Sequence, residues 1–290
     1  MRLPRIVFFS LISATISTMI IFDGKLHAAI LDEKIVNSSS VYKQKILAIV
    51  QVGDNPSSEK YIKVKQTACE KLGVTSRVYR ILPKRGSGYN ELVDLLKTLG
   101  KEDSVSSIIV QLPLPDSSMY SSLDLLPLEK DIDFLSPAKK STPFDDALDG
   151  FATKSPVIRA LEYYLGSNGI NTDTTNRVGI IGQGDLVGKP CHDYLTYRKF
   201  NTTIIENYTV GDQLNFDLLI LSTGVPKLIN PNDIQTGCHV VDFGSAVVNE
   251  KTVGDLNTDY DCSHLGIVSK SPGGMGPLVV RFLLMNHLHI

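Results

Sequence analysis

The chain has 290 residues, enough to bury a sizeable core and to form two domains. Its 29 Lys and Arg residues nearly balance 31 Asp and Glu residues, so it lacks the basic excess typical of proteins that bind nucleic acid. Its four cysteines show no CxxC spacing and no histidines at metal-ligand intervals; they are Cys69, Cys191, Cys238 and Cys262. We therefore expect reduced thiols, no structural metal, and no nucleic-acid or membrane partner.

The first part of the chain alternates apolar strand-like segments with helical ones. Asn55 to Ser58 supplies N-cap and turn chemistry for a helix, and Gly73 ends it. The expected segments are a strand over 45–52, a helix from that turn through about Leu72, a strand over 74–79, a helix over 89–99 and a strand over 106–111. This β-α-β-α-β order favours a parallel sheet.

A second alternating series follows a polar, proline-interrupted segment, 139–149, which we expect to be a loop. Its expected segments are a strand over 177–181, a helix opened by Pro190, strands over 202–205, 217–221 and 239–242, and a last helix over 277–288. The sequence therefore predicts a two-domain α/β fold, with parallel sheets and a cleft between the domains. The second domain is the candidate for binding a nucleotide.

Tyr61 and Lys65 are four residues apart on an expected helix, so their side chains share one face. Taken alone, the pair could be a packed tyrosine beside a solvated lysine. Gln111 ends an apolar strand and precedes Pro113 and Pro115, which cannot extend a sheet, so its amide is a candidate group at a cleft wall. Tyr-x-x-x-Lys also occurs in short-chain dehydrogenases, but there it follows the Gly-rich turn, whereas here it precedes that turn.

Asp131 and Asp133 alternate with Ile132 in a segment that points both carboxylates to one side if it is extended. A carboxylate can accept two parallel hydrogen bonds from an aminopyrimidine edge. The alternative is a solvated acidic loop. We choose Asp133 as the binding carboxylate and Asp131 as the second candidate.

The segment from Gly182 to Gly188 has one residue more than the standard dinucleotide-binding spacing, so the generic fingerprint fits it poorly. Gly182 permits a tight exit from a strand, and the helix that begins near Pro190 has free amides that can face phosphate. A purely structural strand-turn-helix is the alternative. Glu206 lies 24 residues beyond Gly182, near where dinucleotide folds place an acid against ribose hydroxyls.

Ordered motifs across about 250 residues resemble the bifunctional methylene-tetrahydrofolate dehydrogenase/methenyl-tetrahydrofolate cyclohydrolase family. The matching segments are Phe22-Asp23-Gly24-Lys25, residues 52–61, Val110-Gln111-Leu112-Pro113-Leu114-Pro115, Glu129-Lys130-Asp131-Ile132-Asp133, Val187-Gly188-Lys189-Pro190, Ser222-Thr223-Gly224 and Pro272-Gly273-Gly274-Met275-Gly276-Pro277. The resemblance implies a folate-binding catalytic domain over 19–150, completed by a terminal helix over 277–290. It implies a Rossmann-like NAD(P)-binding domain over 151–276, and a homodimer formed through that domain.

The resemblance also implies roles for individual residues. Lys65 would be the general acid/base, oriented by Gln111, while Tyr61 and Asp133 would contact the folate ring. The expected substrate-binding residues are Ser58, Tyr61, Asp133, Pro272, Gly273 and Gly274. The expected cofactor-binding residues are Gly182, Gln183, Gly184, Asp185, Val187, Gly188, Pro190, Glu206, Thr223 and Gly224.

Four departures from the family pattern bear on cofactor choice and on the two activities. The segment 135–140 replaces His-Pro-x-Asn-x-Gly, 151–156 replaces Pro-Cys-Thr-Pro-x-Gly, Gly182-Gln183-Gly184 replaces Gly-Arg-Ser, and 206–208 replaces Cys-His-Ser. Because Gln183 stands where an arginine is usual, we expect NAD in preference to NADP. The alternatives are a member that binds without turnover, or one that retains a single activity.

Arg2 and Arg5 precede an apolar stretch over 6–21 that imitates a signal peptide. The family-like opening begins directly behind this stretch, at Phe22, and leaves no spacer for a cleavage site. We therefore expect Met19 to be the biological start, residues 1–18 to be an extension, and the protein to be cytoplasmic. A leader without function and a true export signal are the alternatives.

Overall fold

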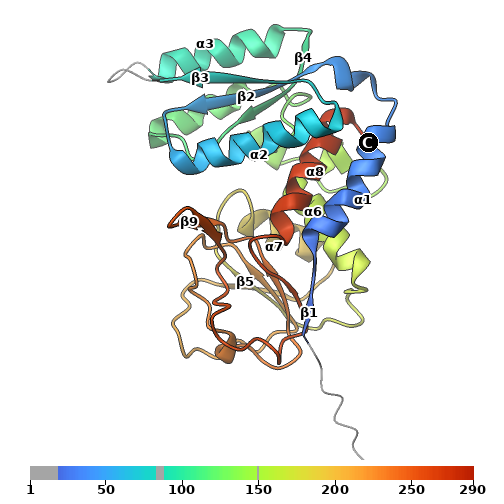
Figure 1. Cartoon of the computed structure of the whole chain (residues 1–290), viewed down its shortest axis with the longest axis vertical. Helices are drawn as coiled ribbons and strands as arrows, with labels where there is room; N and C mark the ends of the chain where they lie inside the picture. The colour runs from blue at the N-terminus through green and yellow to red at the C-terminus, as the bar shows by residue number, and fades with distance from the viewer. Residues whose placement is uncertain (1–18, 83–87, 149) are drawn as a thin grey trace, which may run out of the picture.

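The protein contains two parallel sheets, each with helices beside it, in a computed structural model that describes residues 19–82, 88–148 and 150–290 (Figure 1). Residues 1–18, on which the predicted extension or leader falls, lie outside the described part of the chain. Within the described residues, no helix is both long enough and apolar enough to cross a membrane.

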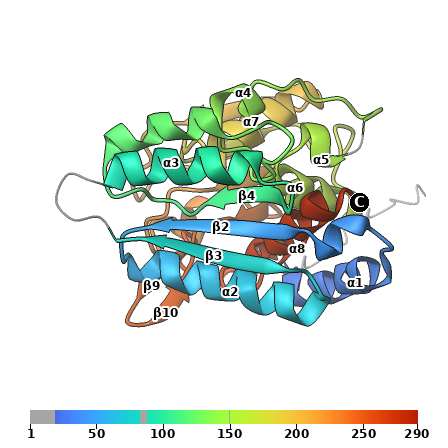
Figure 2. The ribbon, with the colours of Figure 1, turned by 90° about the horizontal axis from the view of Figure 1, so that it is seen from above.

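The first sheet has the strand order β3-β2-β4, formed by β2 (Ile46–Val52), β3 (Ser76–Ile81) and β4 (Val105–Val110). All its pairings are parallel, as predicted. The helices α2 (Pro56–Leu72) and α3 (Gly88–Lys101) lie on opposite faces of this sheet (Figure 2). Asn55 caps α2 through hydrogen bonds from Ser57 N and Ser58 N, and Gly73 ends it with φ +69°, which confirms both predicted signals.

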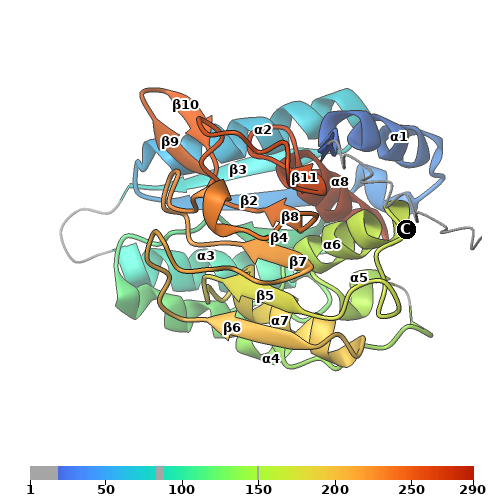
Figure 3. The ribbon, with the colours of Figure 1, turned by 90° about the horizontal axis from the view of Figure 1, so that it is seen from below.

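The second sheet has the order β1-β11-β8-β7-β5-β6, and its pairings are also parallel (Figure 3). Its strands are β1 (Ile20–Ile21), β5 (Val178–Ile181), β6 (Thr202–Ile205), β7 (Leu218–Leu221), β8 (His239–Asp242) and β11 (Ile267–Ser269). The helix α7 (Gly188–Tyr197) follows β5. The four predicted strands of this domain are present within one residue of their expected bounds.

Several elements were not predicted. They are the strands β1 and β11, α1 (Gly24–Asn37), α4 (Pro137–Lys140), α5 (Gly150–Thr153), α6 (Pro156–Ser167), the hairpin of β9 (Ala246–Val248) and β10 (Lys251–Val253), and the 3-10 helices η1 (Val41–Gln44), η2 (Ser117–Leu125) and η3 (Pro231–Asp233). The segment expected as a loop, 139–149, begins inside α4, and residues 141–148 have no helix or strand. Residue 149 lies outside the described residues.

The last helix, α8 (Met275–Leu288), packs against α1 and α6 and links the two sheets. The Arg281 guanidinium pairs with Asp32 of α1 at 2.7 Å, and buried His287 contacts Ser107 Oγ of β4 at 2.9 Å. One apolar cluster therefore runs from the first sheet through α1, α6 and α8 to one face of the second sheet. β1 pairs in the second sheet before α1 begins, so the chain crosses between the domains close to Phe22.

Candidate active site

Lys65 lies on the face of α2 that is turned toward the end of β4. Its Nζ donates a hydrogen bond to Gln111 Oε1 at 3.1 Å. The Gln111 amide is itself fixed, because its Nε2 donates to Leu112 O at 2.9 Å and its backbone N donates to Val50 O at 2.8 Å. The rigid end of β4 thus presents an acceptor to one lysine amine, and the structure brings these two predicted residues together.

Lys65 and Asp133 form an electrostatically coupled pair. Burial lowers the pKa of Lys65, and the negative charge of Asp133 partly opposes that shift. Burial raises the pKa of Asp133 to about 6, again against the opposing charge of its partner. Each group therefore changes its proton occupancy more readily near neutral pH than an exposed lysine or aspartate does, which is what acid/base chemistry requires.

Asp131 and Asp133 have different environments although they are two residues apart. Asp131 is fully buried, and both of its oxygens accept hydrogen bonds: Oδ1 from Leu135 N at 2.9 Å, and Oδ2 from Ser136 N at 2.8 Å and Ser136 Oγ at 2.7 Å. Asp133 makes no hydrogen bond with any residue that the structure describes, and it lines a pocket. Asp131 thus fixes the loop, and Asp133 is free to bind a ligand.

Phe134, which directly follows Asp133, has a left-handed backbone with φ +57°, a conformation that a bulky residue rarely adopts. Neighbouring contacts hold it in place. Lys139 Nζ lies 4.8 Å from the centre of the Phe134 ring and donates to Ala152 O at 3.2 Å. The loop that presents Asp133 is therefore fixed from both sides.

Tyr61 reaches from α2 to the other domain. Its hydroxyl donates to the Ser245 hydroxyl in a very short contact and lies 3.4 Å from Ser245 O. Lys60 Nζ donates to Thr252 Oγ1 of β10 at 3.0 Å, so α2 contacts the second domain at two neighbouring residues. Ser58 is buried and donates to Leu112 O at 3.4 Å, so its hydroxyl is engaged with the loop after Gln111.

The turn after β5 brings backbones into close approach. Gly182 has φ +99°, and a Cβ on Gly188 would lie 2.0 Å from Gly182 O, so neither position accepts a side chain. No side chain caps the start of α7 at Val187, among the described residues. Gln183 and Gly184 follow Gly182, and Asp185 pairs with Lys189 at 2.7 Å. This uncapped turn fits the pyrophosphate of a dinucleotide cofactor.

Glu206 is exposed and directly follows β6. The register pairs Ile205 with Ile181, so Glu206 lies beside Gly182 at the same edge of the sheet. This is the position at which dinucleotide folds place an acid near the ribose.

In the segment from Pro272 to Gly274, Pro272 is exposed and Gly274 is buried. A Cβ on Gly24 would lie 1.7 Å from Gly274 O, so the loop and the start of α1 are in backbone contact. Gly273 has φ +101° and, with an added Cβ, would meet nothing closer than Lys25 Cε at 3.9 Å. Of this segment, Pro272 and Gly273 are thus accessible, and Gly274 is held against α1.

Two buried carboxylates that sequence reasoning missed lie behind the turn after β7. Asp255 Oδ2 accepts hydrogen bonds from Thr223 N at 2.5 Å and Gly224 N at 3.3 Å, and so holds two predicted cofactor-binding residues. Asp242 Oδ1 accepts from Gly244 N at 2.8 Å and from Asp255 N at 3.2 Å. Burial raises the pKa of Asp242 to about 7. An acid at the carboxyl end of a parallel strand, such as Asp242, was the signal available in the sequence.

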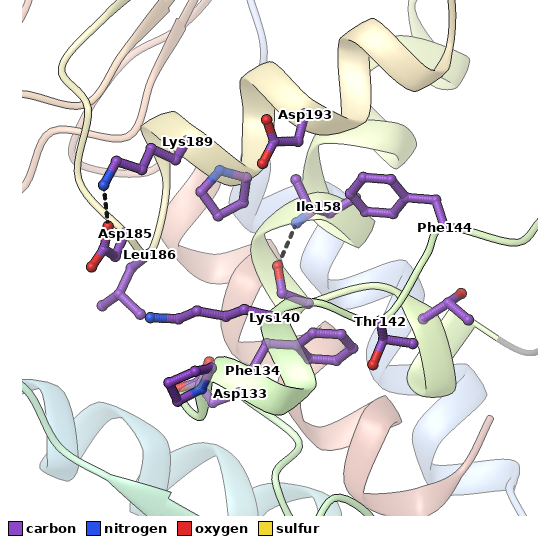
Figure 4. A pocket seen from close by; sticks show the side chains of 14 residues that line it. Asp133, Phe134, Lys140, Thr142, Phe144, Ile158, Asp185, Leu186, Lys189 and Asp193 are labelled. Carbon is purple, nitrogen blue, oxygen red and sulfur yellow. Dashed lines mark hydrogen bonds and ion pairs between the residues drawn. The ribbon is translucent and has the colours of Figure 1, made fainter. Parts of the chain in front are cut away.

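A pocket of about 400 Å³ lies between the domains (Figure 4). It brings together Asp133, Asp185 and Pro190 of the predicted site, while Lys65, Tyr61 and Gln111 do not line it. Both segments that depart from the family pattern, 135–140 and 151–156, contribute to its wall. The lining residues are Asp133, Phe134, Pro137, Lys140, Thr142, Phe144, Thr153, Ser155, Ile158, Asp185, Leu186, Lys189, Pro190 and Asp193.

All four cysteines are buried and free, and no group of three or more His, Cys, Asp or Glu side chains in the described residues could hold a metal ion. Burial raises the pKa of Cys69, which lies on α2 one turn after Lys65, to about 11. The site chemistry of the described chain therefore rests on lysine, amide and carboxylate groups.

Comparison with known proteins assigns both halves of the chain. Residues 22–133 match the profile of the tetrahydrofolate dehydrogenase/cyclohydrolase catalytic domain, and residues 155–290 match the NAD(P)-binding domain of the same family. The bifunctional FolD protein of Aquifex aeolicus is 33% identical, over 93% of this chain and 94% of the relative, and that of Moorella thermoacetica is 33% identical over 92% and 96%.

A solved structure of bifunctional FolD methylenetetrahydrofolate dehydrogenase/cyclohydrolase from Campylobacter jejuni is 28% identical. It superposes with a TM-score of 0.80 and covers 93% of this chain and 97% of that one. These matches confirm the predicted two-domain α/β fold, the enzyme family and the NAD(P) class of cofactor. The chain belongs to the tetrahydrofolate dehydrogenase/cyclohydrolase family.

Proposed function

We propose that this protein oxidises 5,10-methylenetetrahydrofolate to the 5,10-methenyl form with a nicotinamide dinucleotide, and hydrolyses the methenyl form to 10-formyltetrahydrofolate. The observation that carries this proposal is the Lys65 amine, held at 3.1 Å by Gln111 and coupled electrostatically to Asp133. A lysine with a lowered pKa is the type of group that this hydrolysis needs. Water must be activated for attack on the methenyl carbon, and the ring nitrogen must be protonated as the intermediate opens.

Lys65 would move both protons. In its neutral form it accepts a proton as water attacks, and the resulting ammonium donates a proton to the leaving nitrogen. Gln111 accepts a hydrogen bond from the amine and so orients it toward the substrate without adding a charge that would stabilise the ammonium. Burial and a neutral acceptor together keep the pKa of Lys65 lowered, as this cycle requires.

Asp133 would bind the pterin edge. Its carboxylate has no hydrogen bond to the described protein, so both oxygens can accept from an aminopyrimidine. The hydrogen bonds of Asp131 support this choice, because they leave Asp131 without a free oxygen. Tyr61 would stack on or hydrogen-bond to the ring, after its hydroxyl leaves Ser245. Ser58 and Gly273 would form the remaining wall.

The cofactor accepts a hydride when it is bound, and the turn of 182–188 would hold its pyrophosphate, with Thr223 and Gly224 beside it. We favour NAD over NADP. Glu206 accepts hydrogen bonds from a free ribose diol but repels a ribose phosphate, and Gln183 brings no positive charge to offset that repulsion.

A member with one activity or with none is the competing proposal, because both altered segments line the pocket. Lys65 and Gln111 favour cyclohydrolase competence, since neither lines the pocket with these segments and the amine remains coupled to Asp133. A purified-protein assay distinguishes the possibilities. It follows methenyltetrahydrofolate at its absorbance maximum as the compound forms from methylenetetrahydrofolate with NAD or NADP, and as it disappears by hydrolysis. No change in either direction would refute catalysis.

For assembly and location, we propose a cytoplasmic homodimer formed through the second domain. β6 is an edge strand of its sheet and is partly exposed, so it offers unpaired backbone groups to a second copy. Analytical ultracentrifugation of the parent and of Ile204→Pro, which removes a backbone N–H that faces away from β5, tests the proposal. A parent sedimenting as a monomer contradicts it.

A further inference from the structure

Lys140 is the last residue of α4 and forms part of the first-domain wall of the pocket. Its side chain extends toward Leu186 and Asp185, on the opposite wall (Figure 4). The Lys140 backbone N donates to Ser136 O at 3.0 Å, but its exposed ammonium makes no hydrogen bond or ion pair with any residue in the described part of the chain. Its charge nevertheless acts on Asp185, whose pKa is lowered first by the hydrogen bond from Lys189 and further by Lys140. A cation thus stands in the cleft without a bonded partner.

The opposite wall of the pocket presents backbone N–H groups that also lack a hydrogen-bond partner among the described residues. The amides of Gly184, Asp185 and Leu186 donate to no acceptor among the described residues, and they precede the uncapped start of α7. Successive free amides beside a helix N-terminus form an anion-binding concavity. The nearest carboxylate, Asp185, is already paired with Lys189 at 2.7 Å, so its charge is largely offset locally. Asp193 and Asp133 also line the pocket.

We propose that Lys140 binds the pyrophosphate of the dinucleotide cofactor from the folate-domain side, opposite the amides of residues 184–186. This inference rests on the proposed function, because it takes the cofactor site as given. It also gives a positive charge to a turn in which Gln183 is neutral, because Lys140 supplies that charge from the opposite wall. Lys140 would therefore be a specificity residue for ligands that contain a pyrophosphate.

The proposed site also spans the cleft between the two domains. The amides belong to the second domain and the lysine to the first, so one pyrophosphate would be bound from both walls. A ligand without phosphates would gain nothing from Lys140. Adenosine and ADP-ribose differ in this respect, since both carry the adenosine group but the latter also carries the pyrophosphate.

The test measures ADP-ribose binding by calorimetry and adenosine binding by ligand-observed NMR, in the parent and in Lys140→Gly, Lys140→Gln and Lys140→Arg. Lys97→Gln on α3, which removes an exposed lysine away from the pocket, is the control. We expect ADP-ribose to bind about tenfold more weakly to the Gly and Gln variants, as for loss of one charge-assisted contact. Lys140→Arg and Lys97→Gln should bind ADP-ribose like the parent, and adenosine should bind equally to all. Adding Gln183→Arg to Lys140→Gly should restore affinity for ADP-ribose.

Unchanged ADP-ribose affinity in both Lys140→Gly and Lys140→Gln overturns the proposal. Equal weakening of adenosine overturns it as well, because it shows a general disturbance of the domain. Failure of the parent to bind ADP-ribose at all would refute the cofactor site of the proposed function, and is thereby distinguished from failure of Lys140. Thermal melting of each variant checks folding, and the Gln variant decides the question if the Gly variant does not fold.

Discussion

The amine of Lys65 lies 3.1 Å from the amide oxygen of Gln111, and these two residues come from different layers of the first domain. Lys65 belongs to a helix on one face of the sheet, and Gln111 directly follows β4, an edge strand of the same sheet. The neutral amide orients the amine without giving it an ionic partner. The protonation state of Lys65 is therefore sensitive to the charge at position 111.

Gln111→Glu should move the ascending limb of the cyclohydrolase pH-rate profile to higher pH and lower the rate at pH 7. A carboxylate at that position stabilises the ammonium form and raises the pKa of Lys65. The same charge placed by Gln66→Glu, on α2 in a separate surface pocket with Lys63 and Glu70, is the matched control and should leave the profile in place. An unshifted limb in Gln111→Glu would argue against an acid/base role for its partner.

Asp133→Asn should raise the KM for the folate substrate more than the KM for the cofactor. The amide can accept at only one atom where the pterin edge needs two acceptors. In the parent, affinity for folate should fall as the pH drops through about 6, because the carboxylate becomes protonated, and the variant should lack this dependence. Initial rates across pH 5 to 8 measure both effects. An unchanged KM for folate would refute the assignment of Asp133 as the binding carboxylate.

The sequence predicted the three strands of the first sheet and four of the six strands of the second, because buried parallel strands are short apolar runs bounded by glycine, proline or polar turns. It did not predict β1 and β11, whose two and three residues are too short to form such a run. It predicted α2 from its cap and terminator. It did not predict α1, although the buried positions Ala28, Leu31 and Ile35 follow helical spacing, because exposed apolar residues such as Leu26 and Ile30 weaken the helical period. The hairpin of β9 and β10 is short, exposed and without a strong turn signal.

The residues of the candidate site also fall into those that a local sequence pattern predicts and those that it does not. Lys65, Gln111 and Asp133 carry local signals: a shared helix face, a proline-stopped strand and an alternating pair. The partners of Tyr61, and the support that Asp255 gives to Thr223 and Gly224, join residues separated by about 30 to 180 positions, so no local pattern could predict them. Lys140 became a candidate only when the pocket placed it opposite the turn of residues 182–188.

The parent should lose stability as the pH rises from about 4 to about 7, through the contribution of Asp242. The folded state raises the pKa of this buried acid from an ordinary 3.8 to about 7, so it retains the proton that the unfolded chain releases. Asp242→Asn should flatten this part of the profile, whatever its effect on absolute stability. Urea unfolding at pH 5, 6, 7 and 8 measures the slope, with exposed Asp103→Asn as the control. Parallel slopes in the parent and in Asp242→Asn would contradict the shifted pKa.

Glu206→Ser should shift cofactor preference toward NADP, since it removes a carboxylate beside the ribose and leaves a hydroxyl that can donate to a phosphate. Close like charges can cost several kcal/mol, so we expect at least a tenfold change in the ratio of kcat/KM for the two cofactors. The parent should prefer NAD. A parent that prefers NADP, or a variant whose ratio does not move, would end this assignment.

The most direct test of the whole account is the rate of methenyltetrahydrofolate hydrolysis by the parent and by Lys65→Met, with NADH binding measured on the same samples. The account predicts that the variant loses about 100- to 10,000-fold in hydrolysis rate, the usual loss for a positioned acid/base group. It should still bind NADH like the parent, because Lys65 lies in the other domain. A variant that hydrolyses at the parent's rate would contradict the assignment of Lys65 and with it the mechanism proposed for this site.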